Sequence, residues 1–184
     1  SLRFGPAYFL MLDSNLSMAP GSEQRAWIES KLERLPAGVR YLFVAMHHPV
    51  VTRSRSGWFR RGHSALPEHE ELGRWLEDKS TSLRIQTVVL AGHVHNYERY
   101  VRRGVTYVVT GGGGGRPHHI RRGSEDFYRN PGKAFHYCRI SFGQRALNFE
   151  MVELVLDGPQ PRFKTGDSFT LPAIQQTPAA MAAP

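Results

Sequence analysis

The sequence has a single cysteine and lacks a long hydrophobic run, and both facts narrow the classes it can belong to. Cys138 stands alone among 184 residues, which excludes an intrachain disulfide and predicts a buried, inert thiol. No apolar stretch approaches the roughly 18 residues that a membrane-spanning helix needs. The first residues, SLRFGPAYFLMLDSN, have none of the features of a secretory signal and read as a strand. The cellular compartment stays open.

Acidic residues are also outnumbered, which gives the chain a strong positive charge. There are 24 Lys and Arg against 16 Asp and Glu, a net charge of +8, with arginines concentrated at 53–61 and 116–122. Such charge attracts phosphates, acidic surfaces or nucleic acid without choosing among them. A hydrophobic content of 40% is ordinary for a globular domain that buries a core.

The hydrophobic pattern predicts strands and helices in alternation, followed mostly by strands. Short apolar runs predict strands, and Ser22 is placed to cap a helix whose apolar residues recur at helical spacing. The order favours an α/β layered sheet whose later part turns antiparallel. We expect a domain over residues 1–172 and a disordered tail at 173–184. The expected strands are 7–13, 41–46, 85–92, 104–111, 135–142, 146–154 and 162–171, and the expected helices are 22–35 and 67–78.

Histidines follow two of the expected buried strands. His47 comes after the strand 41–46, while His93 and His95 come after 85–92 with one residue between them. In open α/β sheets, ligands bind at the carboxyl ends of the strands. Residues two apart in extended backbone point to the same side, so His93 and His95 can converge on one pocket, and His47 can join them. Imidazole is a common metal ligand, and Gly92 would let the backbone turn tightly there. The alternative is three ordinary, hydrogen-bonded histidines.

The segments FVAMHHP (43–49) and AGHVHNYER (91–99) resemble the two C-terminal signature blocks of calcineurin-like metallophosphoesterases. The second block is especially similar to purple acid phosphatases, in which Gly-His-x-His is followed by Tyr-Glu-Arg. The segments SEQRAWIESKL, GVTYVVTGGGG and DSFTL extend the resemblance over residues 5 to 170. It implies a layered β-sandwich flanked by helices.

The resemblance also implies a chemistry. His47 and His93 would bind one ion of a binuclear centre and His95 the other, the ions being iron, zinc or manganese in divalent or trivalent form. The centre activates water for attack on the phosphorus of a phosphate ester. The resemblance alone assigns these three ligands.

The sequence departs from the family by lacking its N-terminal blocks. The family's D-x-H or D-x-G, G-D-x-x-(D/Y) and G-N-H-(D/E) blocks, which supply carboxylate and amide ligands, are absent. Gly166-Asp167 is interpreted as structural, and the segment LDSN (12–15) has no histidine. We therefore expect this chain to be the C-terminal half of the domain, with one metal ion or none, and the complete protein to be the enzyme.

Several further residues flank the two blocks. In the arginine-rich loop after His47, the residues expected to contact substrate phosphate are His63, Arg53 and Arg55. Residues 97–99 are expected to orient the loop that bears the ligands.

Other residues are assigned no part in binding. His48, which precedes Pro49, is expected to point away from the metals, and His118, His119 and His136 to be surface or strand residues. The glycine run 111–115 lacks the Lys-Ser/Thr of a phosphate-binding P-loop, which favours a flexible loop beside the site.

Two other functions stay open. The chain could be a non-catalytic module that binds phosphate or, less favoured, nucleic acid and has lost the metals, or a structural protein with one incidental histidine site.

Overall fold

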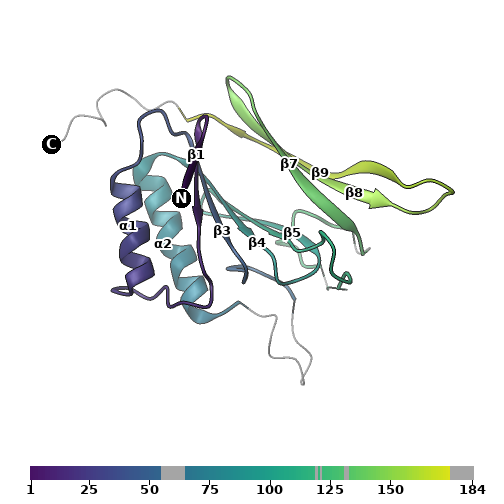
Figure 1. Ribbon diagram of the computed structural model, residues 1–184, viewed down its shortest axis with the longest axis horizontal. Helices are drawn as coiled ribbons and strands as arrows, with labels where there is room; N and C mark the ends of the chain where they lie inside the picture. The colour runs from purple at the N-terminus through teal and green to yellow at the C-terminus, as the bar shows by residue number, and fades with distance from the viewer. Residues whose placement is uncertain (55–64, 119, 121, 131–132, 175–184) are drawn as a thin grey trace.

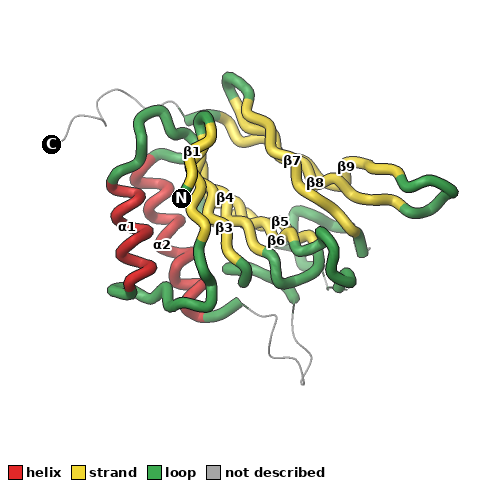
Figure 2. The backbone as a smooth tube through the Cα atoms, in the orientation of Figure 1, coloured by secondary structure: helices red, strands yellow, loops and turns green. Residues whose placement is uncertain are grey.

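Two β-sheets and two helices form three layers in the computed structural model, which describes residues 1–54, 65–118, 120, 122–130 and 133–174 (Figures 1 and 2). The larger sheet has the strand order β1-β2-β3-β4-β6-β5, and the smaller has the order β7-β8-β9. The strands are β1 (Leu2–Phe4), β2 (Ala7–Met11), β3 (Tyr41–Met46), β4 (Gln86–Ala91), β5 (Tyr97–Arg102), β6 (Val105–Thr110), β7 (Phe135–Phe142), β8 (Ala146–Val155) and β9 (Arg162–Pro172).

The larger sheet is parallel in its middle and antiparallel at both edges. β2, β3, β4 and β6 run parallel, whereas β1 and β5 pair antiparallel with their neighbours. The apolar runs of β3 and β4 are buried along most of their length, as strands covered on both faces should be. All four parallel strands therefore end at the same edge of the sheet.

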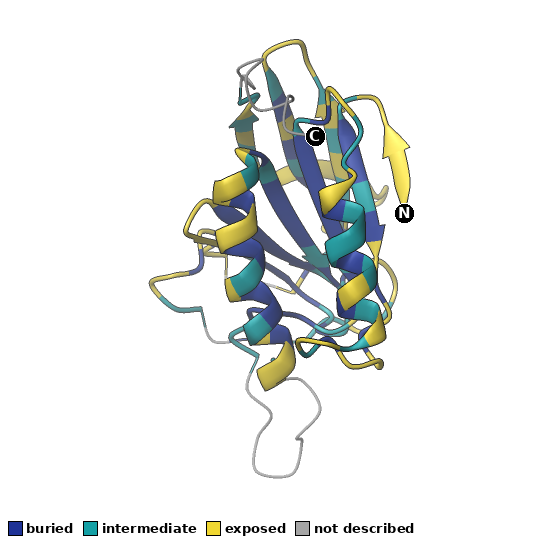
Figure 3. Cartoon of the chain, turned by 90° about the vertical axis from the view of Figure 1, so that its left-hand side faces the viewer, coloured by how far each residue is buried: buried dark blue, intermediate teal, exposed yellow. Residues whose placement is uncertain are grey.

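Both helices lie on one face of the larger sheet (Figure 3). Helix α1 (Glu23–Glu33) begins after Ser22, whose Oγ accepts the Arg25 N–H at 3.3 Å, so the predicted cap is confirmed. Helix α2 (Pro67–Leu83) runs beyond the predicted end at 78. Its last turn contains Ser80 and Thr81, whose hydroxyls donate to the Leu76 and Glu77 carbonyls, so polar residues continue the helix.

The two faces of the larger sheet bury different kinds of side chain. The helix-side core is rich in aliphatic residues, among them Leu10, Ile28, Leu42, Val44, Leu72, Leu76 and Val89. The smaller sheet covers the opposite face and encloses more aromatic residues, among them Tyr41, Phe43, Tyr97, Tyr128 and Phe149. These two cores fix the position of every strand that leads to the histidines.

The α/β layered architecture, with a β-sandwich flanked by helices, is confirmed. Strands β1 and β5 were not predicted. β5 was missed because it reads YERYVR, and its polar side chains find partners inside the protein. β9 ends at Pro172, and of the tail expected at 173–184 the structure describes only 173 and 174, with the Ala173 N–H donating to the Arg145 carbonyl at 2.8 Å.

Two smaller expectations concern Cys138 and membranes. Cys138 is half-buried and not fully buried, with its Sγ 3.2 Å from Thr110 Oγ1. Burial raises the pKa of its thiol to about 11, in keeping with an inert group. Among the described residues, no helix combines the length and apolarity that crossing a membrane requires.

Candidate metal centre

His47 and His93 meet because the strands that precede them are parallel neighbours in register. Met46 of β3 pairs with Ala91 of β4, and the Gly92 N–H then donates to the His47 carbonyl at 3.1 Å. One residue further on, His47 Nε2 lies 3.0 Å from His93 Nδ1. A hydrogen bond joins the two rings, with one nitrogen donating and the other accepting.

His48 completes this group, contrary to the expectation that it points away. Its ring centroid lies 4.5 Å from that of His93 and 5.0 Å from that of His47. His47, His48 and His93 each offer a ligand atom, and these atoms lie within 4.8 Å of one another. We call these three residues the histidine cluster. The expectation failed because the backbone after β3 leaves the sheet at His47 and no longer alternates like a strand.

Ser14, from the loop after β2, holds His48 at two points. Ser14 Oγ lies 2.8 Å from His48 Nδ1 and accepts the His48 backbone N–H at 3.0 Å. Burial lowers the pKa of His48, and the neighbouring His93 and His47 lower it further. His48 is therefore neutral near pH 7, which is the form in which imidazole binds metals.

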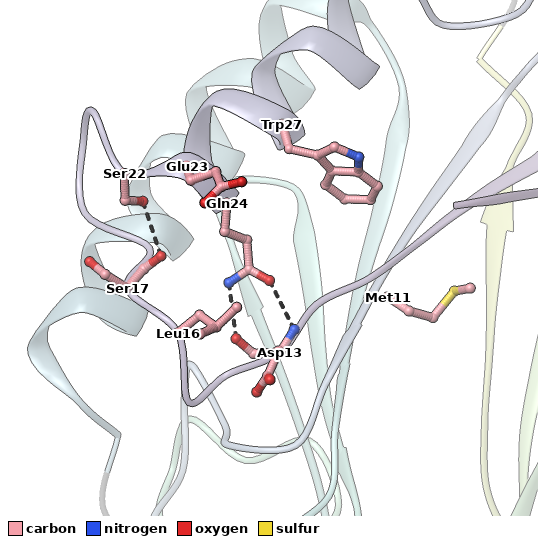
Figure 4. Close-up of a pocket in the computed structure, with 8 residues that line it drawn as sticks. All are labelled: Met11, Asp13, Leu16, Ser17, Ser22, Glu23, Gln24 and Trp27. Atoms are coloured by element: carbon pink, nitrogen blue, oxygen red, sulfur yellow. Dashed lines mark hydrogen bonds between the residues drawn. The ribbon is translucent and has the colours of Figure 1, made fainter.

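The segment that bears Ser14 is fixed by a side-chain clasp (Figure 4). The Gln24 amide of α1 accepts the Asp13 N–H and donates to the Asp13 carbonyl, both at 2.9 Å. The clasp lies in an open hollow of about 560 Å³ between the end of β2 and the start of α1. The hollow is lined by Met11, Asp13, Leu16, Ser17, Ser22, Glu23, Gln24 and Trp27.

The turn after β4 sends the two motif histidines into different surroundings. His93 has φ +58°, and the Val94 N–H donates to the Gly92 carbonyl at 2.6 Å across it, a tight γ-turn. The expectation of extended backbone, with both rings on one side, is therefore wrong. Nor is Gly92 the residue with positive φ, since His93 takes the left-handed conformation itself.

His95 lies against the glycine run and outside the histidine cluster. Its Nδ1 is 3.2 Å from the Arg116 carbonyl, and its ring stacks on His118 at 4.6 Å. We call His95 and His118 the glycine-backed pair, because a Cβ on Gly115 would overlap the His95 ring. A Cβ on Gly111 would overlap the backbone carbonyl of Val94. Gly111 and Gly115 thus pack closely against the second half of the motif, whereas Gly113 and Gly114 lie in open space.

Glu98 ties β5 to the loop that follows the cluster. Its side chain is fully buried and accepts hydrogen bonds from Thr52 Oγ1 at 2.8 Å, from the Arg53 N–H at 2.7 Å and from Tyr100 Oη. Burial raises the pKa of the Glu98 carboxyl, and the donated hydrogen bonds act in the opposite direction. The contacts are those expected of a residue that orients the loop.

Tyr97 and Arg99 tie the same strand to the smaller sheet. Arg99 donates from Nε and Nη2 to the two carboxylate oxygens of Asp167 on β9, at 2.6 and 3.0 Å, and Tyr97 Oη donates to Asp167 at 2.9 Å. The two ionic side chains are 13% and 11% exposed. The interpretation of Gly166-Asp167 as structural agrees with these contacts.

Of the residues expected to contact phosphate, the structure describes only Arg53. Its guanidinium packs against Gly123, and its Nε is buried without a hydrogen-bond partner among the described residues. Arg55 and His63 lie outside the described residues, as does His119. His136, expected as a surface or strand residue, is a buried residue of β7 with Nε2 3.1 Å from Thr110 Oγ1.

The cluster suits a metal that prefers nitrogen ligands. Three imidazoles converge, and in the part of the chain that the structure describes no carboxylate belongs to the cluster. Such a set fits zinc, cobalt, nickel or copper better than magnesium or calcium. Sequence reasoning found His47 and His93 but missed His48, although the His47-His48 dipeptide was visible, and it missed Ser14, which only the fold brings near.

Comparisons with known proteins place two purple acid phosphatases among the relatives of this chain. No family profile matches the chain. It is 29% identical over 146 residues to purple acid phosphatase 23 and 29% identical over 154 residues to probable purple acid phosphatase 20, both of Arabidopsis thaliana. These alignments cover 75% and 78% of this chain but only 28% and 33% of the relatives.

A solved structure shares the fold. GAP50, described as the anchor in the inner membrane complex of Plasmodium, superposes with a TM-score of 0.57 at 14% identity, covering 93% of this chain and 50% of that one. The chain thus spans about a third or less of the curated relatives' length and half of this structure's chain.

Proposed function

We propose that this chain, which resembles the purple acid phosphatases within the calcineurin-like metallophosphoesterases, supplies histidine ligands for metal-dependent hydrolysis of phosphate esters. One observation carries the proposal: the ends of β3 and β4 bring His47 Nε2 and His93 Nδ1 to 3.0 Å. Buried parallel strands hold both residues, so the arrangement needs no movement of the main chain to receive an ion.

The three histidines of the motifs divide between two ions in this proposal. His47 and His93 bind the first, and His95, held in the separate glycine-backed pair, binds the second. The different surroundings of His93 and His95 support this division. The ions are iron, zinc or manganese, and when bound they supply an activated water and polarise the phosphate oxygens.

The chain's other residues bind and orient. Arg53, with its backbone fixed by Glu98, and the expected Arg55 and His63 would bind the negatively charged phosphate. Glu98 and Arg99 keep the ligand-bearing turn in place through Thr52 and Asp167.

No carboxylate belongs to the histidine cluster among the described residues. In this proposal the carboxylate ligands of the family would come from a segment outside residues 1–172. The chain alone is then half a site, and activity belongs to the complete protein.

The test uses the product of the complete reading frame. His93→Ala should remove turnover of a chromogenic phosphate ester and lower the metal content from about two ions per molecule to about one. Asp157→Ala, at an exposed ion pair on the β8–β9 hairpin, is the matched control and should change neither. Unchanged turnover in His93→Ala would refute the assignment.

A different outcome favours the non-catalytic alternative. If the reading frame encodes no D-x-H, G-D and G-N-H blocks and the product holds no metal, the proposal fails. Binding of phosphate or nucleic acid by that product would then identify a binding module.

A further inference from the structure

We infer that His48 is a third metal ligand, and that it forms with His47 and His93 a site for one divalent cation that this chain binds by itself. The inference deepens the proposed function and rests on it for the ion held by His47 and His93. His48 belongs to neither the V-x-x-H nor the G-H-x-H pattern, so the sequence motifs do not assign it.

The spacing of the rings supports three nitrogen ligands. In tetrahedral coordination with Zn–N near 2.0–2.1 Å, two ligand nitrogens lie about 3.4 Å apart. His47 Nε2 and His93 Nδ1 are already 3.0 Å apart, and all three ligand atoms lie within 4.8 Å. The His48 nitrogen therefore lies near the other two, somewhat beyond the spacing that a bound ion would give.

The contacts of His48 leave one nitrogen free to bind an ion. Ser14 Oγ occupies the region of Nδ1 at 2.8 Å, so Nε2 is the nitrogen that can bind. Metal-binding histidines commonly have their other ring nitrogen hydrogen-bonded in this way, which fixes the ring and the tautomer. The hydrogen bond is pre-formed, because the Gln24 clasp on Asp13 fixes the segment that carries Ser14 (Figure 4).

His69 further restricts the His48 ring. It lies in the first turn of α2, is 2% exposed, and stacks on His48 with centroids 5.9 Å apart. A ring confined by Ser14 and His69 loses less side-chain entropy when it binds an ion. The set is all-nitrogen, so Zn²⁺, Co²⁺ or Ni²⁺ is the expected class, with a fourth position left for water or a phosphate oxygen.

The experiment titrates this chain with Zn²⁺ in a calorimeter and with Co²⁺ in a visible-absorption assay. We expect one ion per chain and an intense Co²⁺ absorption of low-symmetry, four-coordinate type. His48→Gln should weaken binding by more than about 100-fold and reduce that absorption, and Ser14→Ala by about 10- to 100-fold, since it removes only the supporting hydrogen bond. Asp157→Ala, at an exposed ion pair on the β8–β9 hairpin, is the control and should leave both the affinity and the spectrum unchanged.

Three outcomes would overturn the inference: no binding by the unaltered chain, wild-type affinity in His48→Gln, or an equal loss in Asp157→Ala. Circular dichroism of each variant excludes misfolding as the cause, and Ser14→Ala keeps the test valid if His48→Gln does not fold. Binding lost in His47→Gln and His93→Gln but kept in His48→Gln would refute the role of His48 alone. The proposed function would then stand, because it is tested separately by turnover in the complete protein.

Discussion

The two histidines of Gly92-His93-Val94-His95 differ in what holds them in place. His93 belongs to the histidine cluster, where each ring contacts other imidazoles that come from the ends of neighbouring strands. His95 belongs to the glycine-backed pair, where the Arg116 carbonyl, the His118 ring and Gly115 lie against its ring. The position of His93 depends on contacts with other histidine side chains. The position of His95 depends on a glycine, whose lack of a side chain leaves room for the ring.

This difference teaches that one short motif can supply two sites only if different parts of the chain hold each histidine in place. Parallel strand pairing places His93. The loop 111–118 places His95, because the His118 N–H donates to the His95 carbonyl at 2.7 Å and the Gly111 N–H donates to the Asn96 carbonyl at 3.1 Å. The two supports can therefore be broken independently.

The largest effect should come from Asp167, which anchors the strand following both histidines. Asp167→Ala leaves the largely buried Arg99 without its carboxylate and should cost about 3–5 kcal/mol of unfolding free energy, measured by urea denaturation. Asp157→Ala is the matched control, because its partner Arg162 also makes a two-point ion pair but the side chains are 60% and 64% exposed. It should cause little or no loss. Equal losses of unfolding free energy in the two variants would contradict the role of Asp167 in anchoring β5.

A smaller loss of stability should follow from adding a methyl group at Gly111, in the loop that supports the glycine-backed pair. In Gly111→Ala the new methyl group overlaps the Val94 carbonyl, which is backbone and cannot move aside. We expect a loss of about 1–3 kcal/mol in urea denaturation. Gly113→Ala, with no atom within 4 Å of its Cβ, should be neutral and serves as the control. A neutral Gly111→Ala would show that this loop does not support the motif.

Gly115→Ala should cost less stability than Gly111→Ala. It should show more clearly that His95 and His93 are held independently. The added methyl group meets the His95 ring, which can rotate, so the backbone need not shift. Proton–nitrogen spectra of the imidazoles should show changed signals for His95 and His118 and unchanged signals for His47 and His93. Equal changes in all four would mean that the two groups are coupled.

The smallest effect concerns the pH dependence of stability. Burial lowers the pKa of His136, which packs behind the glycine run with its N–H on the Gly112 carbonyl. The unfolded chain therefore takes up a proton below about pH 6.5 before the folded chain does, so stability falls as the pH drops below that value. His136→Gln should reduce this slope in urea denaturations between pH 7.5 and about pH 5. Part of the slope should remain, because the pKa values of His48 and His69 are also lowered by burial. An unchanged slope would contradict the assignment to His136.

The sequence predicted the strands and helices whose pattern reflects burial. β3 and β4 are continuous apolar runs, and Ser22 caps α1 as expected. β5 could not be predicted, because Glu98 and Arg99 are polar residues buried with partners that lie 45 and 68 positions away along the chain. Local patterns carry no information on such contacts.

The candidate site was predicted in part for the same reason. His47 and His93 follow recognisable strands, so their meeting could be inferred from parallel pairing. The place of His48 depends on Ser14, 34 positions earlier, and the separation of His95 from His93 depends on a positive φ that no neighbouring glycine signals.

That positive φ has a consequence for how the chain would change under selection. A non-glycine residue in the left-handed region stores strain of about 1–3 kcal/mol, which glycine does not incur. His93 therefore lowers the stability of the fold. Selection for thermal stability alone should favour glycine at this position. If active proteins nevertheless retain histidine at this position, selection for metal binding must outweigh selection for stability.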